Sequence, residues 1–243
     1  VPNHLTFSSG WEWGYWAVDW SIARWSWRST FDNEEFIPEP MEWVTALGHS
    51  DNVRNNLEQH LELQQEYLLN KNLLRYMCAQ TVTDEFSLFR KQFQPRPDFT
   101  FKWLARKSDE GTRDRVAKVD IPLLQEYYSK SEELTMQLAS MMDTLTPSPL
   151  REYFIGLQVT SLRAKHRACT VNSILAHREK RKTDKEHWLD KARGIRLQGV
   201  GLVHKQELAY KYDPEYLYST RFSHTSYPHG YLYAPHDLHF WKR

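Results

Sequence analysis

Two carboxylates near the start of the chain lie among tryptophan side chains. Glu12 stands between Trp11 and Trp13, and Asp19 directly precedes Trp20. Indole rings around a carboxylate displace water, so its pKa rises and its protonated form can act as a general acid. A pair of carboxyl groups is the minimum for glycoside hydrolysis, and a separation of seven positions, roughly 10 Å along a helix, is near the upper end for an inverting pair. The pattern therefore makes Glu12 and Asp19 candidate catalytic residues.

The same segment has the composition of a sugar-binding surface, because flat aromatic rings stack on the C–H faces of sugars. The candidate ligand-binding residues are Trp11, Trp13, Tyr15, Trp16, Trp20 and Arg24. A second interpretation stays open. The side chains Trp13, Trp16, Trp20, Ala23 and Trp27 recur at steps of three and four, which places them on one face of a helix. In that case the tryptophans form a core stripe and Glu12 stabilises the start of the helix.

Four histidines cluster near the end of the chain. They are His224, His229, His236 and His239, with Asp237 among them. Imidazole and carboxylate groups suit zinc, copper or nickel, so these histidines are candidate metal ligands. Their spacing matches no established zinc pattern, and the tyrosines and prolines between them favour a hydrogen-bonded aromatic tail instead. We therefore expect no metal and no other cofactor.

A basic stretch follows in the second half of the chain. It comprises Arg163, Lys165, Arg167, Arg178, Lys180, Arg181 and Lys182, against the single acid Glu179. Such a stretch can hold phosphate, sulfate or uronate groups. The alternative is a solvated helix face that Asp184 and Glu186 partly neutralise. Phosphate-loop, nucleophile-elbow, zinc-protease and dinucleotide-binding motifs do not occur.

Apolar residues recur with the helical period along most of the chain, which predicts an all-α fold. The clearest pattern covers residues 119–145 and 149–182, where Ser148 and Pro149 mark the start of the second helix. Because only the short turn at Thr146, Pro147, Ser148 and Pro149 joins the two segments, they are predicted to form a long antiparallel helical hairpin. A further helix is expected from Thr183 toward Tyr210. The charged stretch 106–118 contains a glycine and is expected to be a mobile loop.

Composition indicates a globular protein. The 243 residues are 40% apolar, 26% charged and 14% aromatic, with ten tryptophans and a net charge of +1. The balanced charge makes nucleic-acid binding unlikely on physical grounds, and no apolar run is long enough for a membrane span. We expect one mainly helical domain over residues 1–243, with 213–243 as an ordered aromatic tail. Cys78 and Cys169 allow one disulfide or two free thiols.

Two functional hypotheses follow. In the first, a helical module binds, and in one version processes, a carbohydrate at the tryptophan-lined segment. In the second, the chain is a non-catalytic scaffolding subunit that binds other protein chains. The chain starts with Val1 and Pro2, which suggests a processed chain or a piece of a longer protein. An extracellular or cell-envelope location is favoured.

Overall fold

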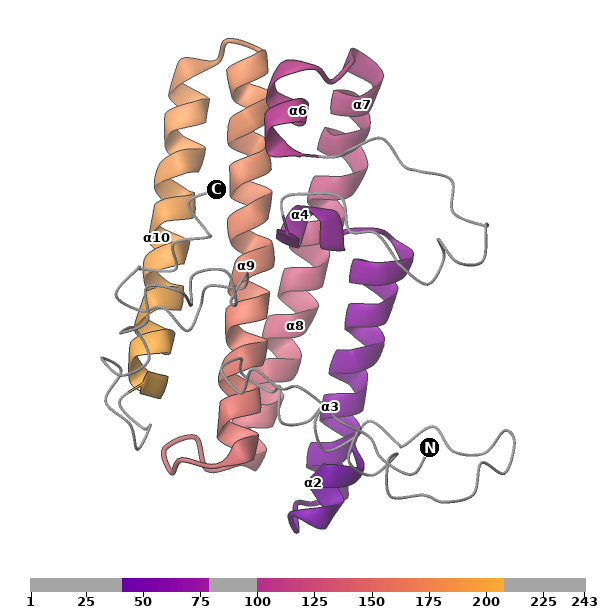
Figure 1. Cartoon of the computed structure of the whole chain (residues 1–243), viewed down its shortest axis with the longest axis vertical. Coiled ribbons are helices and arrows are strands. Elements are labelled where there is room, and N and C mark those ends of the chain that lie inside the picture. The colour runs from indigo at the N-terminus through magenta and orange to yellow at the C-terminus, as the bar shows by residue number, and fades with distance from the viewer. Residues whose placement is uncertain (1–40, 79–99, 208–243) are drawn as a thin grey trace, which may run out of the picture. The chain divides into compact units, whose positions relative to one another are not determined.

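The computed structural model describes residues 41–78 and 100–207, and these residues form helices with no β-strand (Figure 1). The all-α prediction is therefore confirmed for this part of the chain. The expected tail 213–243 lies outside the described residues. No helix in the described part is long and apolar enough to cross a membrane.

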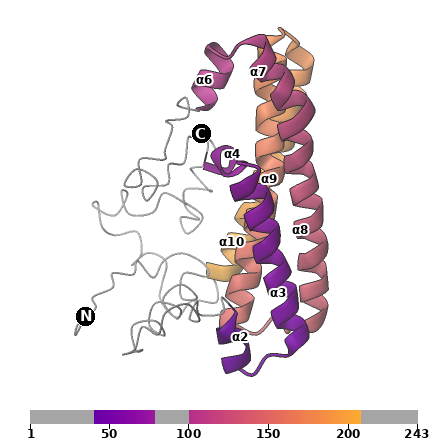
Figure 2. The ribbon, with the colours of Figure 1, turned by 90° about the vertical axis from the view of Figure 1, so that its right-hand side faces the viewer.

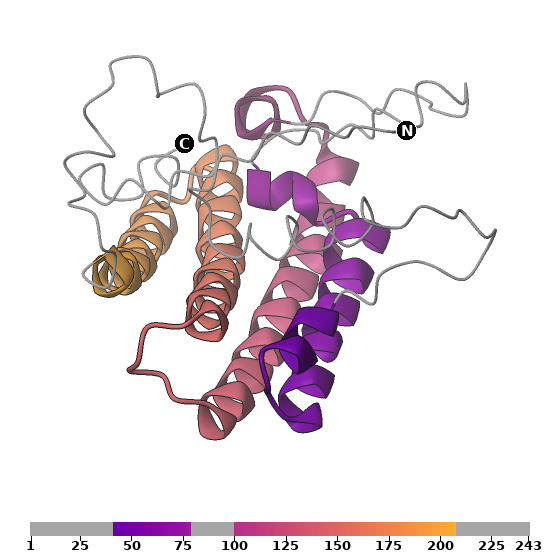
Figure 3. The same ribbon diagram turned by 60° about the horizontal axis from the view of Figure 1, so that its bottom comes forward.

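The three longest helices lie close to the expected ranges. The full order is α2 (Glu42–Ala46), α3 (Asp51–Gln64), the π-helical turn η1 (Gln65–Asn70), α4 (Leu74–Cys78), α6 (Phe101–Arg106), α7 (Glu110–Arg115), the π-helical turn η2 (Val116–Asp120), α8 (Ile121–Met141), α9 (Pro149–Arg178) and α10 (Lys182–Glu207). The predicted cap of α9 is confirmed, because the Ser148 hydroxyl accepts a hydrogen bond from the Arg151 amide at 3.1 Å. Figure 3 brings the turn between α8 and α9 forward.

The expectation of a loop over residues 106–118 is wrong. These residues form the end of α6, all of α7 and part of η2. The Thr100 hydroxyl accepts from the Trp103 amide at 2.9 Å and caps α6, and the Asp109 carboxylate accepts from the Thr112 amide at 2.7 Å and caps α7. The caps satisfy amides that would otherwise lack partners, so two short helices form in spite of Gly111.

The chain divides into two compact units. The first contains residues 41–61, 133–159 and 200–207 of the described part, and the second contains residues 62–78, 100–132 and 160–199. The helices α3, α8, α9 and α10 contribute residues to both units. We describe each unit separately, and the single-domain expectation stays a prediction.

The first unit buries an aromatic and aliphatic core. Trp43 is fully buried and its ring centroid lies 5.6 Å from that of Tyr153 on α9. Burial raises the pKa of Tyr153 to about 12. The Asn56 side-chain amide donates to the Leu134 carbonyl at 3.0 Å, which ties α3 to α8. His60, one turn along α3 from Asn56, is also buried.

The second unit combines an apolar core with paired charges. The buried Tyr67 packs against Tyr127 with ring centroids 6.0 Å apart, and its hydroxyl accepts from Lys130 at 2.9 Å. The helices α8 and α9 meet where the Ser161 hydroxyl donates to the Tyr128 carbonyl at 3.4 Å. The residues that fill this core come from all parts of the unit; the fully buried ones include Leu73, Tyr76, Leu104, Leu124 and Val171.

A buried carboxylate joins α4 to the start of α8. Asp120, the last residue of η2, is only 2% exposed and accepts hydrogen bonds from the Arg75 guanidinium at 2.8 Å and from the Tyr76 hydroxyl. The charge pair and the hydroxyl both contact one carboxylate oxygen, Oδ2, and compensate for the burial of the charge. Burial and the nearby carboxylate raise the pKa of Tyr76. This network explains why α4 is held against the π-helical turn.

Candidate functional site

The residues that the sequence singles out for chemistry lie outside the described part of the chain. These are the candidate catalytic residues Glu12 and Asp19, the candidate ligand-binding residues Trp11, Trp13, Tyr15, Trp16, Trp20 and Arg24, and the weak metal candidates His224, His229, His236 and His239. Their roles stay predictions. The site that the structure does describe consists of the second half of the basic stretch and the helices that hold it.

Three tryptophans belong to the described residues, and they differ in exposure. Trp43 is a core residue of the first unit, whereas Trp103 on α6 and Trp188 on α10 are partly exposed. The Lys191 ammonium lies 4.8 Å from the centre of the Trp188 ring, and His187 meets the same ring edge-on. Trp103 and Trp188 therefore present aromatic surface beside basic groups.

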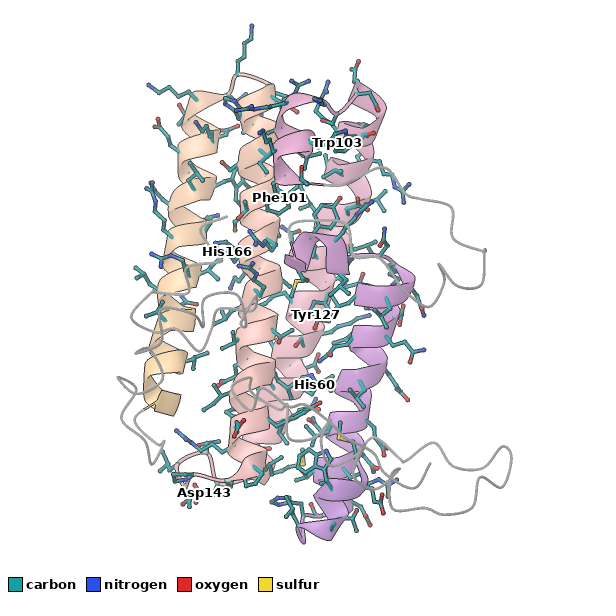
Figure 4. The ribbon with its side chains drawn as sticks, in the orientation of Figure 1. His60, Phe101, Trp103, Tyr127, Asp143 and His166 are labelled. Carbon is teal, nitrogen blue, oxygen red and sulfur yellow. The ribbon has the colours of Figure 1, made fainter. Side chains whose placement is uncertain are left out.

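The first half of the basic stretch is built into the second unit. Arg163 donates to the Met77 carbonyl at 3.2 Å, and Lys165 donates to the Tyr128 hydroxyl at 2.7 Å. Arg167 is only 1% exposed, and its guanidinium lies 4.9 Å from the centre of the Phe101 ring (Figure 4). These three side chains pack and pair within the fold, so they are not a solvated helix face.

A neutral histidine lies within this basic region. His166 on α9 is buried, and Figure 4 labels its place along this helix. Its pKa is lowered to about 2, mainly by burial and in addition by the nearby guanidinium groups of Arg163, Arg167 and Arg196. His166 is therefore uncharged near neutral pH and does not serve there as a proton donor.

The second half of the basic stretch is exposed at the turn between α9 and α10. Lys180 and Lys182 project into solvent, while Arg181 is paired with Glu179 at 2.7 Å and with Asp184. The two carboxylates raise the pKa of Arg181. Only this half of the stretch is available to bind an anion from solution.

Two observations on the described residues concern metal binding and thiol chemistry. No group of three or more His, Cys, Asp or Glu side chains within residues 41–78 and 100–207 is placed to hold a metal ion. Cys169 is a buried free thiol whose pKa burial raises, so it is not an activated nucleophile.

Sequence reasoning missed the basic residues that α6 contributes. Lys102, Arg106 and Lys107 are exposed and lie beside Trp103 in sequence. Arg106 and Lys107 belong to the charged stretch 106–118, which was expected to be a mobile loop, and no helix was predicted over Lys102. The available signal was Thr100, which has a side chain favoured at helix N-caps and directly precedes the apolar and basic residues of α6.

Comparison with known proteins adds no assignment. The chain matches no family, and no curated protein or solved structure is significantly similar to it. A functional proposal therefore depends on the residues themselves.

Proposed function

We propose that the chain is a helical module that binds carbohydrate through its tryptophan-rich segment. The observation that carries the proposal is the density of indole rings and carboxylates over residues 11–20, which supplies both stacking faces and hydrogen-bond acceptors for sugar hydroxyls.

Tryptophan fluorescence tests this proposal directly. The whole chain is titrated with neutral and acidic oligosaccharides, and we expect a saturable spectral shift with one class of sugar. Trp13→Ala and Trp16→Ala should each abolish the shift while the circular dichroism spectrum stays helical. Trp188→Ala is the matched control, since it removes a partly exposed indole elsewhere and should keep the response. Absence of any response to every sugar would overturn the proposal.

A hydrolytic version of this function assigns general-acid chemistry to Glu12 and a second carboxylate role to Asp19. It is tested with the sugar that the fluorescence titration selects. We expect Glu12→Gln to abolish turnover while binding is retained, because an amide has the shape of the acid but no proton to transfer. Unchanged turnover in Glu12→Gln excludes Glu12 as the acid.

The alternative function is a scaffolding subunit of a larger protein assembly. It is favoured by exposed apolar side chains at the end of α8 and in the following turn, where Met136 is 63% exposed and Leu145 is 84% exposed. Methionine is enriched at the cores of protein interfaces. Sedimentation of the purified chain tests this alternative. A monomer across a wide concentration range would count against an obligate protein partner.

A further inference from the structure

The turn between α6 and α7 and the turn between α9 and α10 lie side by side within the second unit. Figures 1 and 2 both show them together at the same end of these helices. The Arg178 guanidinium donates to the Arg106 and Ser108 carbonyls, at 3.4 Å in each case, and Arg113 also donates to the Ser108 carbonyl. Arginine side chains therefore join the two turns into one surface.

Positive charge is concentrated on this surface. Residues 102–113 and 178–186 carry nine basic and five acidic side chains, a local excess of four, whereas the whole chain has an excess of one. Three of the acids are engaged locally. Glu179 and Asp184 bind Arg181, and Asp109 caps α7. Glu110 and Glu186 are the other two acids of these residues, and both are exposed.

We call the exposed cations Lys102, Arg106, Lys107, Lys180 and Lys182 the basic end. All five are exposed, and none of them forms a side-chain ion pair in the described part of the chain. Such groups stay hydrated and can exchange water for the oxygens of an anion.

Lys180 occupies a backbone position that favours glycine. Its φ angle is +61°. The amides of Lys180 and Arg181 donate to the His177 and Ala176 carbonyls, which is the hydrogen-bond pattern of a helix that ends at a residue with left-handed backbone conformation. A side chain in this conformation is less stable than glycine. The fold therefore holds a lysine at the tip of the turn at a cost to stability, which is the kind of outlier that marks binding sites.

We propose that the basic end binds the carboxylate or sulfate groups of an acidic polysaccharide. The cations would contact the anionic groups, and the partly exposed indole of Trp103, on α6 with Lys102 and Arg106, offers a ring for stacking on a sugar (Figure 4). This inference deepens the proposed carbohydrate function by naming the sugar class, and it rests on that function.

A polysaccharide fits this surface better than a nucleic acid or a membrane does. The same two segments also carry the carboxylates Glu110 and Glu186, which would repel the closely spaced phosphates of a nucleic acid. None of the exposed large apolar side chains of the described part falls in residues 102–113 or 178–186, so this surface has no group to insert into lipid.

The test is binding of the whole chain to polygalacturonate at low ionic strength, measured by calorimetry. The variant Lys180→Gly with Lys182→Gln should bind at least fivefold more weakly, while its Tm should be no lower because glycine relieves the left-handed residue. The charge-matched control is Lys118→Gln with Arg193→Gln, which removes two exposed cations outside the basic end and should keep the affinity within twofold.

Three results would overturn the proposal: no binding of polygalacturonate, equal weakening in both double variants, or tighter binding of a single-stranded oligonucleotide of equal charge. Neutral oligosaccharides separate this proposal from the function on which it rests. One outcome is that the wild type does not bind polygalacturonate, while Lys180→Gly with Lys182→Gln keeps the fluorescence response to neutral sugars. In that case the basic end is rejected as a binding site and the tryptophan-segment proposal stands. If polygalacturonate binds and Trp13→Ala changes nothing, the basic end stands and the tryptophan segment is not the site.

Discussion

At the scale of single residues, burial rather than pairing decides the state of the histidines. His60 is 1% exposed, and its Nε2 forms no hydrogen bond with any residue that the structure describes. Burial lowers its pKa to about 4, and that of His166 to about 2. Both side chains are neutral in the folded protein at pH 7. They therefore contribute to packing near neutral pH, whereas in acid their protonation destabilises the folded state.

This yields a prediction for stability against pH. In the unfolded chain His60 has the ordinary histidine pKa of about 6.5, so between pH 6.5 and 4 the unfolded state binds a proton that the folded state does not. The contribution of neutral His60 to the free energy of unfolding is therefore fully present above about pH 6.5. It decreases by about 3 kcal/mol as the pH drops toward 4. Urea unfolding at pH 7, 5.5 and 4 measures the loss.

The variant His60→Leu should show a shallower loss between pH 6.5 and 4, because leucine is buried without a titrating group. His177→Gln is the matched control, since His177 is exposed at the end of α9 and its replacement should leave the profile unchanged. An equally steep loss in His60→Leu would show that another group causes the acid sensitivity.

Asp120 gives a second prediction at this scale. Asp120→Asn removes the charge that holds the Arg75 guanidinium and leaves the Tyr76 hydroxyl with a weaker acceptor. We expect a loss of about 2–3 kcal/mol in the free energy of unfolding, since one partner of a largely buried pair is left without compensation. Asp114→Asn, which breaks an exposed pair with Lys118, should cost less than about 0.5 kcal/mol. Equal losses would mean that Asp120 is not buried as described.

At the scale of elements, the helices that apolar periodicity marks were predictable and the capped short ones were not. The start of α9 at Pro149 follows from Ser148 and the periodic apolar residues after it. The helices α6 and α7 were missed because each is six residues long, too short for a periodic pattern. The position of Arg167 was also beyond sequence reasoning, since its ring partner Phe101 lies far away along the chain. Such contacts depend on tertiary packing.

The glycines of the described helices give a prediction at this scale. Gly194 lies exposed within α10, and an added Cβ would have no atom within 4 Å. Gly194→Ala should therefore stabilise the protein by about 0.5–1 kcal/mol, because alanine loses less conformational entropy in a helix. Gly48 also has open space but a φ of +78°, so Gly48→Ala should destabilise by about 1 kcal/mol. Chemical unfolding of both variants measures the contrast; destabilisation by Gly194→Ala would contradict a continuous α10.

At the scale of the whole molecule, near-neutral charge hides a segregated distribution. The local excess of four at residues 102–113 and 178–186 must be offset by acidic side chains elsewhere, since the chain as a whole is at +1. The small net charge gives the whole molecule little attraction for anions. One surface with a local excess of positive charge can nevertheless attract them. Net charge alone therefore does not decide whether this surface binds an anionic partner.

The last prediction separates the two proposed modes of sugar binding by their response to salt. Binding of polygalacturonate to the basic end releases counterions and relies on exposed charges, so raising the salt from 50 to 500 mM should weaken it by at least tenfold. Binding of a neutral oligosaccharide through stacked indoles involves no charge, so its affinity should change less than twofold over the same range. Calorimetric titrations of the same preparation at several salt concentrations measure both. A salt-independent affinity for polygalacturonate would place its binding at an aromatic surface, and the charge segregation would then have no part in it.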